Sequence, residues 1–167
     1  ILLCRTDREL PKELRNKIAL FCNVSKDDVI SAPDVDNIYK LPLVFHEQAL
    51  DSRILAKLGI WAAAARVEPW ERLQHTLEHA RKTVRVGVVG KYVQMADTYK
   101  SLNEALMHGG IANKAAVEII YVDSEELDPG EAGEALAGVD AVLVPGGFGE
   151  RGVEGKVGAI RWARENG

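Results

Sequence analysis

From Val84 onward, the sequence alternates between β-rich apolar runs and helical segments. The expected strands cover residues 84–89, 117–122 and 139–144, and the expected helices cover about 99–108, 130–136 and 154–166. Strands that alternate with helices in this way are connected by βαβ crossovers and lie parallel in one sheet. The sequence therefore predicts an α/β fold for residues 83–167, equal to about half of a typical doubly wound domain.

Residues 1–66 follow a different pattern. The expected elements are a strand at 1–4, a helix that begins at Pro11 and ends near Asn23, and a short strand at 29–30. The helix carries one apolar stripe made of Leu14, Ile18 and Phe21. The apolar segment 38–45 contains a lysine and a proline, which predicts an irregular or edge segment.

Two further helices are expected before the alternating region. One covers 46–58 with an apolar face, and Gly59 can cap it. The other begins at Pro69 and is charged on one side, as connectors between differently organised regions often are. We therefore expect residues 67–82 to form a linker helix.

The composition limits the classes of partner. The 167-residue chain is 47% hydrophobic and carries a net charge of −4. This permits a packed core, and mild acidity disfavours non-specific binding to nucleic acid or to an anionic membrane. We therefore expect no DNA, RNA or membrane partner. Cys4 and Cys22 lie in apolar sequence outside any Cys-x-x-Cys pair, which predicts two reduced, buried thiols in a cytoplasmic protein.

The third expected strand runs into Pro145, Gly146, Gly147, Phe148 and Gly149. Glycines directly after a buried strand place free backbone N–H groups at the carboxyl edge of the sheet, where open α/β sheets bind ligands. Such amides can stabilise an oxyanion, and glycine lets a ligand come close to the backbone. A plain strand-to-helix turn explains the same residues equally well, so the spacing leaves both interpretations open.

Three other patterns carry less weight. Residues 147–152 fit G-x-G-x-x-G, but that fingerprint usually follows the first strand and needs an acidic residue about 20 positions later. The pair Gly90-Lys91 lacks the earlier glycine and the following hydroxyl of a P-loop, so we reject that motif. His75 and His79 fit H-x-x-E-H on the polar face of the expected linker helix, which favours a solvated surface over a zinc site. No metal ligand is expected in this chain.

Two groups of segments stand out by their order along the chain. The first group comprises 4–8, 17–24, 34–39 and 42–48, and the second comprises 88–92, 99–106 and 143–152. The first resembles the end of the synthase (amidoligase) domain of the CTP synthase family, and the second resembles the start of its glutaminase domain. The resemblance implies that residues 1–66 end a P-loop-like synthase domain, that 67–82 form the interdomain linker helix, and that 83–167 begin a flavodoxin-like class I glutaminase domain.

The resemblance also implies the chemistry of that family. Its synthase domain uses ATP and Mg²⁺ to phosphorylate the 4-oxygen of UTP, and ammonia then displaces the phosphate to give CTP. Its glutaminase domain makes the ammonia from glutamine through a cysteine nucleophile with histidine and glutamate partners. GTP acts as an allosteric activator, and the family assembles as homotetramers.

The same resemblance implies roles for residues of this chain. The implied residues are Lys17 and Phe21 for UTP or CTP; Arg5, Pro33, Asp34 and Val35 for ATP; Gly146, Gly147 and Phe148 for glutamine and its oxyanion; and Arg151 for activation by GTP. The family often has lysine where Pro33 stands, so only a backbone contact can persist there.

The catalytic groups of the family are not expected in this chain. The nucleophile of the family stands in a G-x-C-x-G turn, and neither Cys4 nor Cys22 occupies such a turn. We expect that turn within about 15 residues after Gly167 of a longer parent, and no activity from this chain alone. Two alternatives remain: a non-catalytic flavodoxin-like binding module, and another class I glutamine amidotransferase, against which the segments before residue 50 argue.

Overall fold

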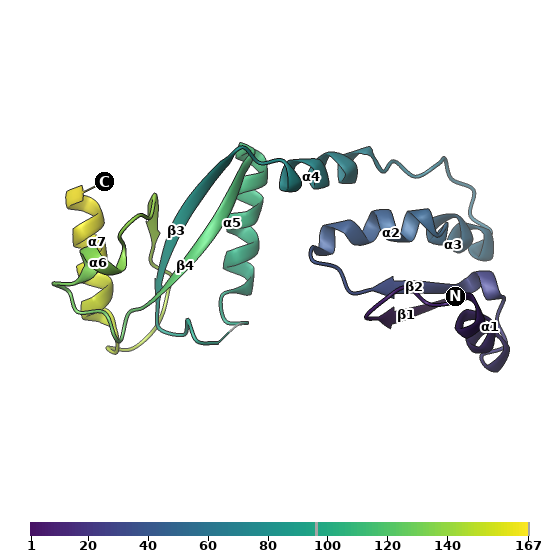
Figure 1. Cartoon of the computed structure of the whole chain (residues 1–167), viewed down its shortest axis with the longest axis horizontal. Coiled ribbons are helices and arrows are strands. Elements are labelled where there is room, and N and C mark those ends of the chain that lie inside the picture. Colours follow the sequence, from purple (N-terminus) through teal and green to yellow (C-terminus); the bar gives the residue numbers. More distant parts are fainter. Residues whose placement is uncertain (96, 167) are drawn as a thin grey trace. The chain divides into compact units, whose positions relative to one another are not determined.

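The computed structural model describes residues 1–95 and 97–166, and it divides into the compact units Ile1–His75 and Thr76–Gly167 (Figure 1). Each unit has its own sheet and its own core. The division lies within the segment that the sequence assigns to the linker, and the assigned domain boundaries stay a prediction. Gly167 lies outside the described residues. Within those residues, no helix is both long and apolar enough to cross a membrane.

In the first unit, helices pack on a parallel pair of strands. Its elements are β1 (Leu2–Thr6), α1 (Lys12–Phe21), the short 3-10 helix η1 (Lys26–Asp28), β2 (Val29–Pro33), the 3-10 helix η2 (Ile38–Lys40), α2 (Leu41–Glu47), α3 (Leu50–Leu58) and most of α4 (Glu68–Glu78). The pairing of β1 with β2 sets Thr6 beside Pro33. Leu10, Ala19 and Val29 form a buried cluster against these strands.

Residues 38–45 are helical, so the expectation of an irregular or edge segment is wrong. Pro42 lies in the first turn of α2, where its missing N–H costs no helical hydrogen bond. The expected helix over 46–58 is divided, because Ala49 adopts a left-handed φ of 59° between α2 and α3. Gly59, with a φ of 64°, ends α3 as predicted.

Helix α1 exposes more apolar surface than its sequence predicts. It begins after Pro11 as expected, but Ala19 is its buried residue, whereas Phe21 is 87% exposed. Cys22 follows the helix and is exposed, and Cys4 is half-buried; both thiols are free. The prediction of a buried thiol is therefore wrong for Cys22, because α1 packs through its alanine and turns its carboxyl end toward solvent.

The second unit forms the parallel α/β sheet that the sequence predicts. Its elements are the end of α4, β3 (Lys82–Gly90), α5 (Lys100–Asn113), β4 (Ala115–Asp123), α6 (Ala132–Ala135), β5 (Ala141–Leu143) and α7 (Val153–Asn166). The strands pair in parallel in the order β4–β3–β5, so the first strand of this unit lies between the next two, as in flavodoxin-like sheets. Val89, Leu127, Leu136 and Ala159 form its buried core.

Helix α5 is longer than predicted and runs through Gly110 to Asn113. A Cβ at Gly110 would lie 2.6 Å from the carbonyl oxygen of Ala115 and 2.8 Å from Cγ2 of Val117. This glycine therefore permits the close approach of α5 to the start of β4 and does not end the helix. Lys114 ends it instead, with a left-handed φ of 55°.

Candidate functional site

The strands of the second unit end at one edge of the sheet. The last residues of β3, β4 and β5 are Gly90, Asp123 and Leu143. The N–H of Ser124 donates a 2.9 Å hydrogen bond to the carbonyl of Gly90, which ties the exit of β4 to that of β3. The loop Pro145–Gly149, here called the glycine loop, leaves β5 at this same edge. The sheet therefore presents the glycine loop where parallel α/β sheets bind ligands.

Two lysine side chains hold the carbonyl groups of the glycine loop. Lys91 follows β3 and is only 7% exposed. Its Nζ donates to the carbonyl oxygens of Phe148 at 2.9 Å and Gly149 at 3.0 Å. Lys156, half-buried in α7, donates from its Nζ to the carbonyl oxygen of Pro145 at 3.1 Å. The loop is therefore fixed from the inside of the unit by charge-assisted hydrogen bonds.

Gly147 lies next to both lysine side chains. A Cβ at this position would lie 3.2 Å from Nζ of Lys156 and 4.0 Å from Cδ and Cε of Lys91. Gly146 and Gly147 are exposed, and within the described residues their N–H groups donate no hydrogen bond. The side chain of Phe148 is 99% exposed. The loop therefore offers free amides and an uncovered aromatic ring.

Helix α7 lies too close to the exit of β4 for larger residues at its glycines. A Cβ at Gly155 would lie 2.3 Å from the carbonyl oxygen of Ser124, and one at Gly158 would lie 2.6 Å from Cα of Pro129. Gly152 has a φ of 68°, and its Cβ would lie 2.5 Å from Oγ of Ser124. The last glycine of the G-x-G-x-x-G pattern therefore serves this packing.

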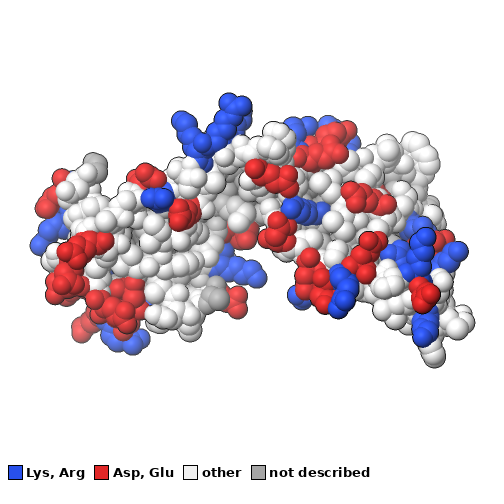
Figure 2. Space-filling model, viewed as in Figure 1, with Lys and Arg blue, Asp and Glu red and all other residues white. Residues whose placement is uncertain are grey.

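Arg151 is exposed just before α7, and its Nη1 lies 3.5 Å from Oε2 of Glu125. Acidic side chains gather around α6 and the loop before it (Figure 2). Glu126, Glu131 and Glu134 line a pocket in this region. Because negative charge repels phosphate, this pocket is a poor site for a nucleotide. Arg151 does not line it.

In the first unit, the residues assigned to ATP lie at the carboxyl ends of β1 and β2. Nε of Arg5 lies 3.0 Å from Oδ1 of Asp34, and the N–H of Asp34 donates to the carbonyl of Thr6 at 2.8 Å. Pro33 ends β2, and Val35 is half-buried one residue beyond Asp34. The structure therefore brings the four assigned residues to one strand edge.

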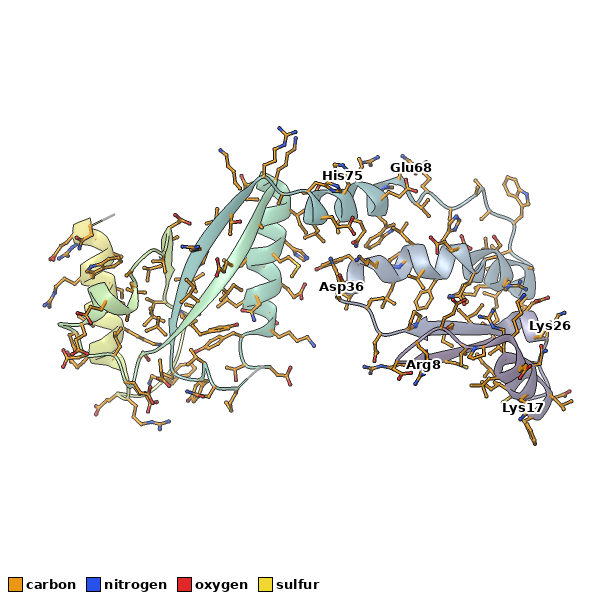
Figure 3. All side chains as sticks on the ribbon, in the orientation of Figure 1. Arg8, Lys17, Lys26, Asp36, Glu68 and His75 are labelled. Atoms are coloured by element: carbon orange, nitrogen blue, oxygen red, sulfur yellow. The ribbon has the colours of Figure 1, made fainter. Side chains whose placement is uncertain are left out.

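The residues assigned to the pyrimidine nucleotide lie elsewhere in the first unit. Lys17 and Phe21 are exposed and stand four residues apart on α1, so they share one face of the helix. Lys17 projects from α1 into solvent (Figure 3). Within the described residues, no hydrogen bond or ion pair connects them to Arg5 or Asp34.

At the glycine loop of the second unit, sequence reasoning missed two residues, Lys91 and Lys156. Lys91 had a signal, because it directly follows a strand expected to be buried and so stands at the ligand-binding edge. Lys156 had none, since its partner Pro145 is met only once α7 packs back against the exit of β5.

Two family models match the chain. Residues 1–60 match the model described as CTP synthase N-terminus, and residues 94–167 match the model described as Glutamine amidotransferase class-I. The chain therefore combines a segment similar to a synthase domain with a segment similar to a class I glutamine amidotransferase domain. The chain is therefore similar to the CTP synthase family, in the junction region of its synthase and glutaminase domains.

The relatives are similar along the whole chain. CTP synthases of Nitratidesulfovibrio vulgaris (strain DP4), Maridesulfovibrio salexigens and Desulfotalea psychrophila are 53%, 51% and 49% identical over 166 residues. Each alignment covers 99% of this chain and 30% of the relative, so the chain spans about 30% of the length of these relatives. A solved structure described as the Trypanosoma brucei CTPS glutaminase domain with bound acivicin is 49% identical, with a TM-score of 0.45, over 50% of this chain and 33% of that chain.

Proposed function

We propose that the full-length protein carrying this sequence aminates UTP to CTP, using ATP and ammonia derived from glutamine. The main support is identity of about 50% to CTP synthases that runs through both compact units without interruption. A shared glutaminase segment alone would fit many amidotransferases. The match of residues 1–60 to the CTP synthase N-terminus distinguishes this family from the others.

The first unit would contribute to the two nucleotide sites. On α1, the ammonium of Lys17 can meet a polyphosphate or a pyrimidine carbonyl, and the ring of Phe21 offers an exposed flat surface for a base. At the β1–β2 edge, Arg5 can stack on the adenine of ATP, and the backbone around Asp34 can accept or donate hydrogen bonds to it. These roles rest on the family resemblance together with the exposure of the residues.

The second unit would contribute the oxyanion site of the glutaminase. Attack on the glutamine amide puts negative charge on its oxygen, and preorganised N–H donors stabilise that charge without reorganising. The N–H groups of Gly146 and Gly147 are free for this purpose, and Phe148 can cover the glutamine side chain. The cysteine nucleophile and its histidine and glutamate partners are assigned to parts of the parent outside this chain.

The family also implies Mg²⁺, activation by GTP near Arg151, a homotetramer and a cytoplasmic location, which we propose for the full-length protein. Across residues 1–95 and 97–166, no three His, Cys, Asp or Glu side chains are grouped so as to hold a metal ion. We propose, from the family resemblance alone, that the Mg²⁺ ligands lie elsewhere in the full-length protein.

A kinetic test separates the two half-reactions. The full-length protein should form CTP with either glutamine or free ammonia. Lys17→Ala should raise the KM for UTP about 10-fold and weaken inhibition by CTP, because a charge-assisted hydrogen bond contributes about 1.5–3 kcal/mol. Glutamine hydrolysis should stay unchanged, since Lys17 lies in the other unit.

The matched control is Lys26→Ala, because Lys26 is an exposed lysine of the same unit with no assigned role (Figure 3). It should leave UTP kinetics unchanged. Equal UTP kinetics in both variants would remove Lys17 from the nucleotide site. No CTP formation by the unaltered protein, with either nitrogen donor, would contradict the proposed function itself.

A further inference from the structure

Lys91 is buried, and among the described residues no carboxylate forms an ion pair with it. A lysine is seldom this buried unless its ammonium is paired, because desolvation of a charge is costly. Within the described residues, Lys91 forms no ion pair, and its Nζ is satisfied by the carbonyls of Phe148 and Gly149 instead. Its positive charge therefore remains as a net charge directly behind the glycine loop.

The lysine contacts also fix the direction of the loop amides. In a trans peptide the carbonyl and the following N–H point to opposite sides, and no cis peptide occurs in the described residues. The carbonyl of Pro145 points to Lys156, so the N–H of Gly146 points away from that lysine. The carbonyl of Phe148 points to Lys91, so the N–H of Gly149 points away from Lys91. Carbonyls therefore face the lysines, and these N–H groups face the opposite side.

A loop needs no buried charge merely to connect a strand to a helix. Here the ammonium of Lys91 donates to carbonyl groups of a segment whose amides are exposed and, among the described residues, donate no hydrogen bond. When the carbonyl groups of these peptides point inward, the N–H groups of the same peptides point outward, where they can bind an anion. A net positive charge on the carbonyl side further favours negative charge near the loop, and it acts strongly because Lys91 is screened from water.

We propose that Lys91 is a positioning residue of the glutaminase reaction, which holds the glycine loop with its N–H groups directed at the oxyanion formed from glutamine. This inference rests on the proposed glutaminase function. Lys91 touches neither glutamine nor the reacting atoms, and it acts through the loop carbonyls. Lys156 holds the carbonyl of Pro145 and so orients the N–H of Gly146, whereas Lys91 holds the far end of the same loop through the carbonyls of Phe148 and Gly149.

The test uses Lys91→Met in the full-length protein, with Lys82→Met as matched control. Lys82 is the exposed first residue of the same strand β3. Glutamine-dependent CTP formation should lose about 10- to 100-fold in kcat/KM in Lys91→Met, mostly in kcat, because oxyanion contacts strengthen in the transition state. Ammonia-dependent CTP formation should stay within about twofold, since free ammonia bypasses the loop.

Rates are expressed per active site, counted by covalent labelling with a reactive glutamine analogue. A lysine with a purely structural role would lower the melting temperature and the number of labelled sites but leave kcat per site unchanged. A kcat/KM for glutamine within about twofold of the Lys82→Met value would therefore overturn the proposal. Lys91→Gln, which removes the charge and keeps a donor, provides the same test should Lys91→Met not fold.

The outcome is distinguishable from failure of the proposed function. An unaltered protein that forms CTP from ammonia and from glutamine establishes the function, whatever the variants do. An unaltered protein that forms no CTP from either donor contradicts the function and with it this inference.

Discussion

The exits of the two parallel sheets are held in different ways. At the β1–β2 edge, Arg5 and Asp34 form an ion pair whose side chains are 86% and 60% exposed. At the β3–β5 edge, Lys91 is 7% exposed and bonds to backbone carbonyls. Water screens the Arg5–Asp34 ion pair but not the hydrogen bonds of Lys91. The two edges therefore differ in how rigid they are before a ligand binds. We expect the glycine loop to be preorganised and the Arg5–Asp34 contact to yield readily to a bound nucleotide.

The largest effects should come from the separate cores beneath the two edges. Ile30 of β2 is 1% exposed, and Leu136 near the end of α6 is fully buried. Ile30→Ala and Leu136→Ala should each lower the free energy of unfolding of their own unit by about 2–5 kcal/mol, because each substitution leaves a cavity. Amide exchange monitored along the chain should show faster exchange mainly in the unit that carries the substitution. Equal acceleration in both units would show that the two edges do not rest on separate cores.

The next effect tests the close packing behind the glycine loop. Gly155→Ala should destabilise the second unit by about 3 kcal/mol, because its Cβ would lie 2.3 Å from a backbone oxygen that can move only with β4. Gly109→Ala is the matched control in helix α5, since nothing lies within 4 Å of its Cβ position. Gly109→Ala should raise the free energy of unfolding by about 0.5–1 kcal/mol, because alanine has a higher helix propensity than glycine. Urea unfolding measures both, and a neutral Gly155→Ala would contradict the packing.

A pH effect is expected in the first unit. Nζ of Lys57 lies 2.6 Å from Oδ2 of the buried Asp28, and this hydrogen bond lowers the pKa of Asp28 in the folded state. A lowered folded pKa stabilises the fold above the unfolded pKa of about 4, and the stabilisation is lost as pH falls through the folded pKa. Asp28→Asn should therefore be less stable than the unaltered chain at pH 7, and the difference should shrink as pH falls through the folded pKa of Asp28. If the difference in urea midpoint between Asp28→Asn and the unaltered chain stayed constant as pH falls, Asp28 would not link stability to pH.

The smallest effect should come from the exposed pair at the β1–β2 edge. Arg5→Ala should change the free energy of unfolding by about 0–1 kcal/mol, as exposed ion pairs usually do. In the full-length protein it should raise the KM for ATP, because the guanidinium is proposed to contact adenine. Arg8→Ala, in the neighbouring loop, is the control (Figure 3). A large loss of stability in Arg5→Ala would show that both edges are firmly held and would remove the contrast between them.

The sequence predicted the fold best where its patterns are regular. Alternation of apolar strands and helices located β3, β4 and β5 and the parallel sheet, because strands joined by helical crossovers lie parallel in one sheet. Continuous burial is found only in the second half of β3 among these strands, and residues of β4 are half-buried or exposed. It failed at 38–45, where Pro42 was taken as a breaker although proline is tolerated in a first helical turn. It also ended α5 too early, because Gly110 is required by a contact with β4 that only the tertiary structure reveals.

The candidate sites were predictable only in part. The glycines after β5 could be recognised because position at a sheet edge and glycine content are both visible in sequence. The hydrogen bonds that orient the loop were not visible, since Lys91 and Phe148 are 57 residues apart. The residues of the first unit came from resemblance, and an exposed helix face such as that of Lys17 looks the same whether it is solvated or binds a nucleotide.

The most direct test of the account follows nitrogen from glutamine into the product. The full-length protein is supplied with UTP, ATP and glutamine labelled with ¹⁵N at the amide, and the CTP is examined by mass spectrometry. We expect one ¹⁵N per CTP, with ADP, phosphate and glutamate formed in equal amounts. Glutamate release without labelled CTP, or no CTP at all when ammonia replaces glutamine, would contradict the assignment of this chain to a glutamine-dependent CTP-forming enzyme.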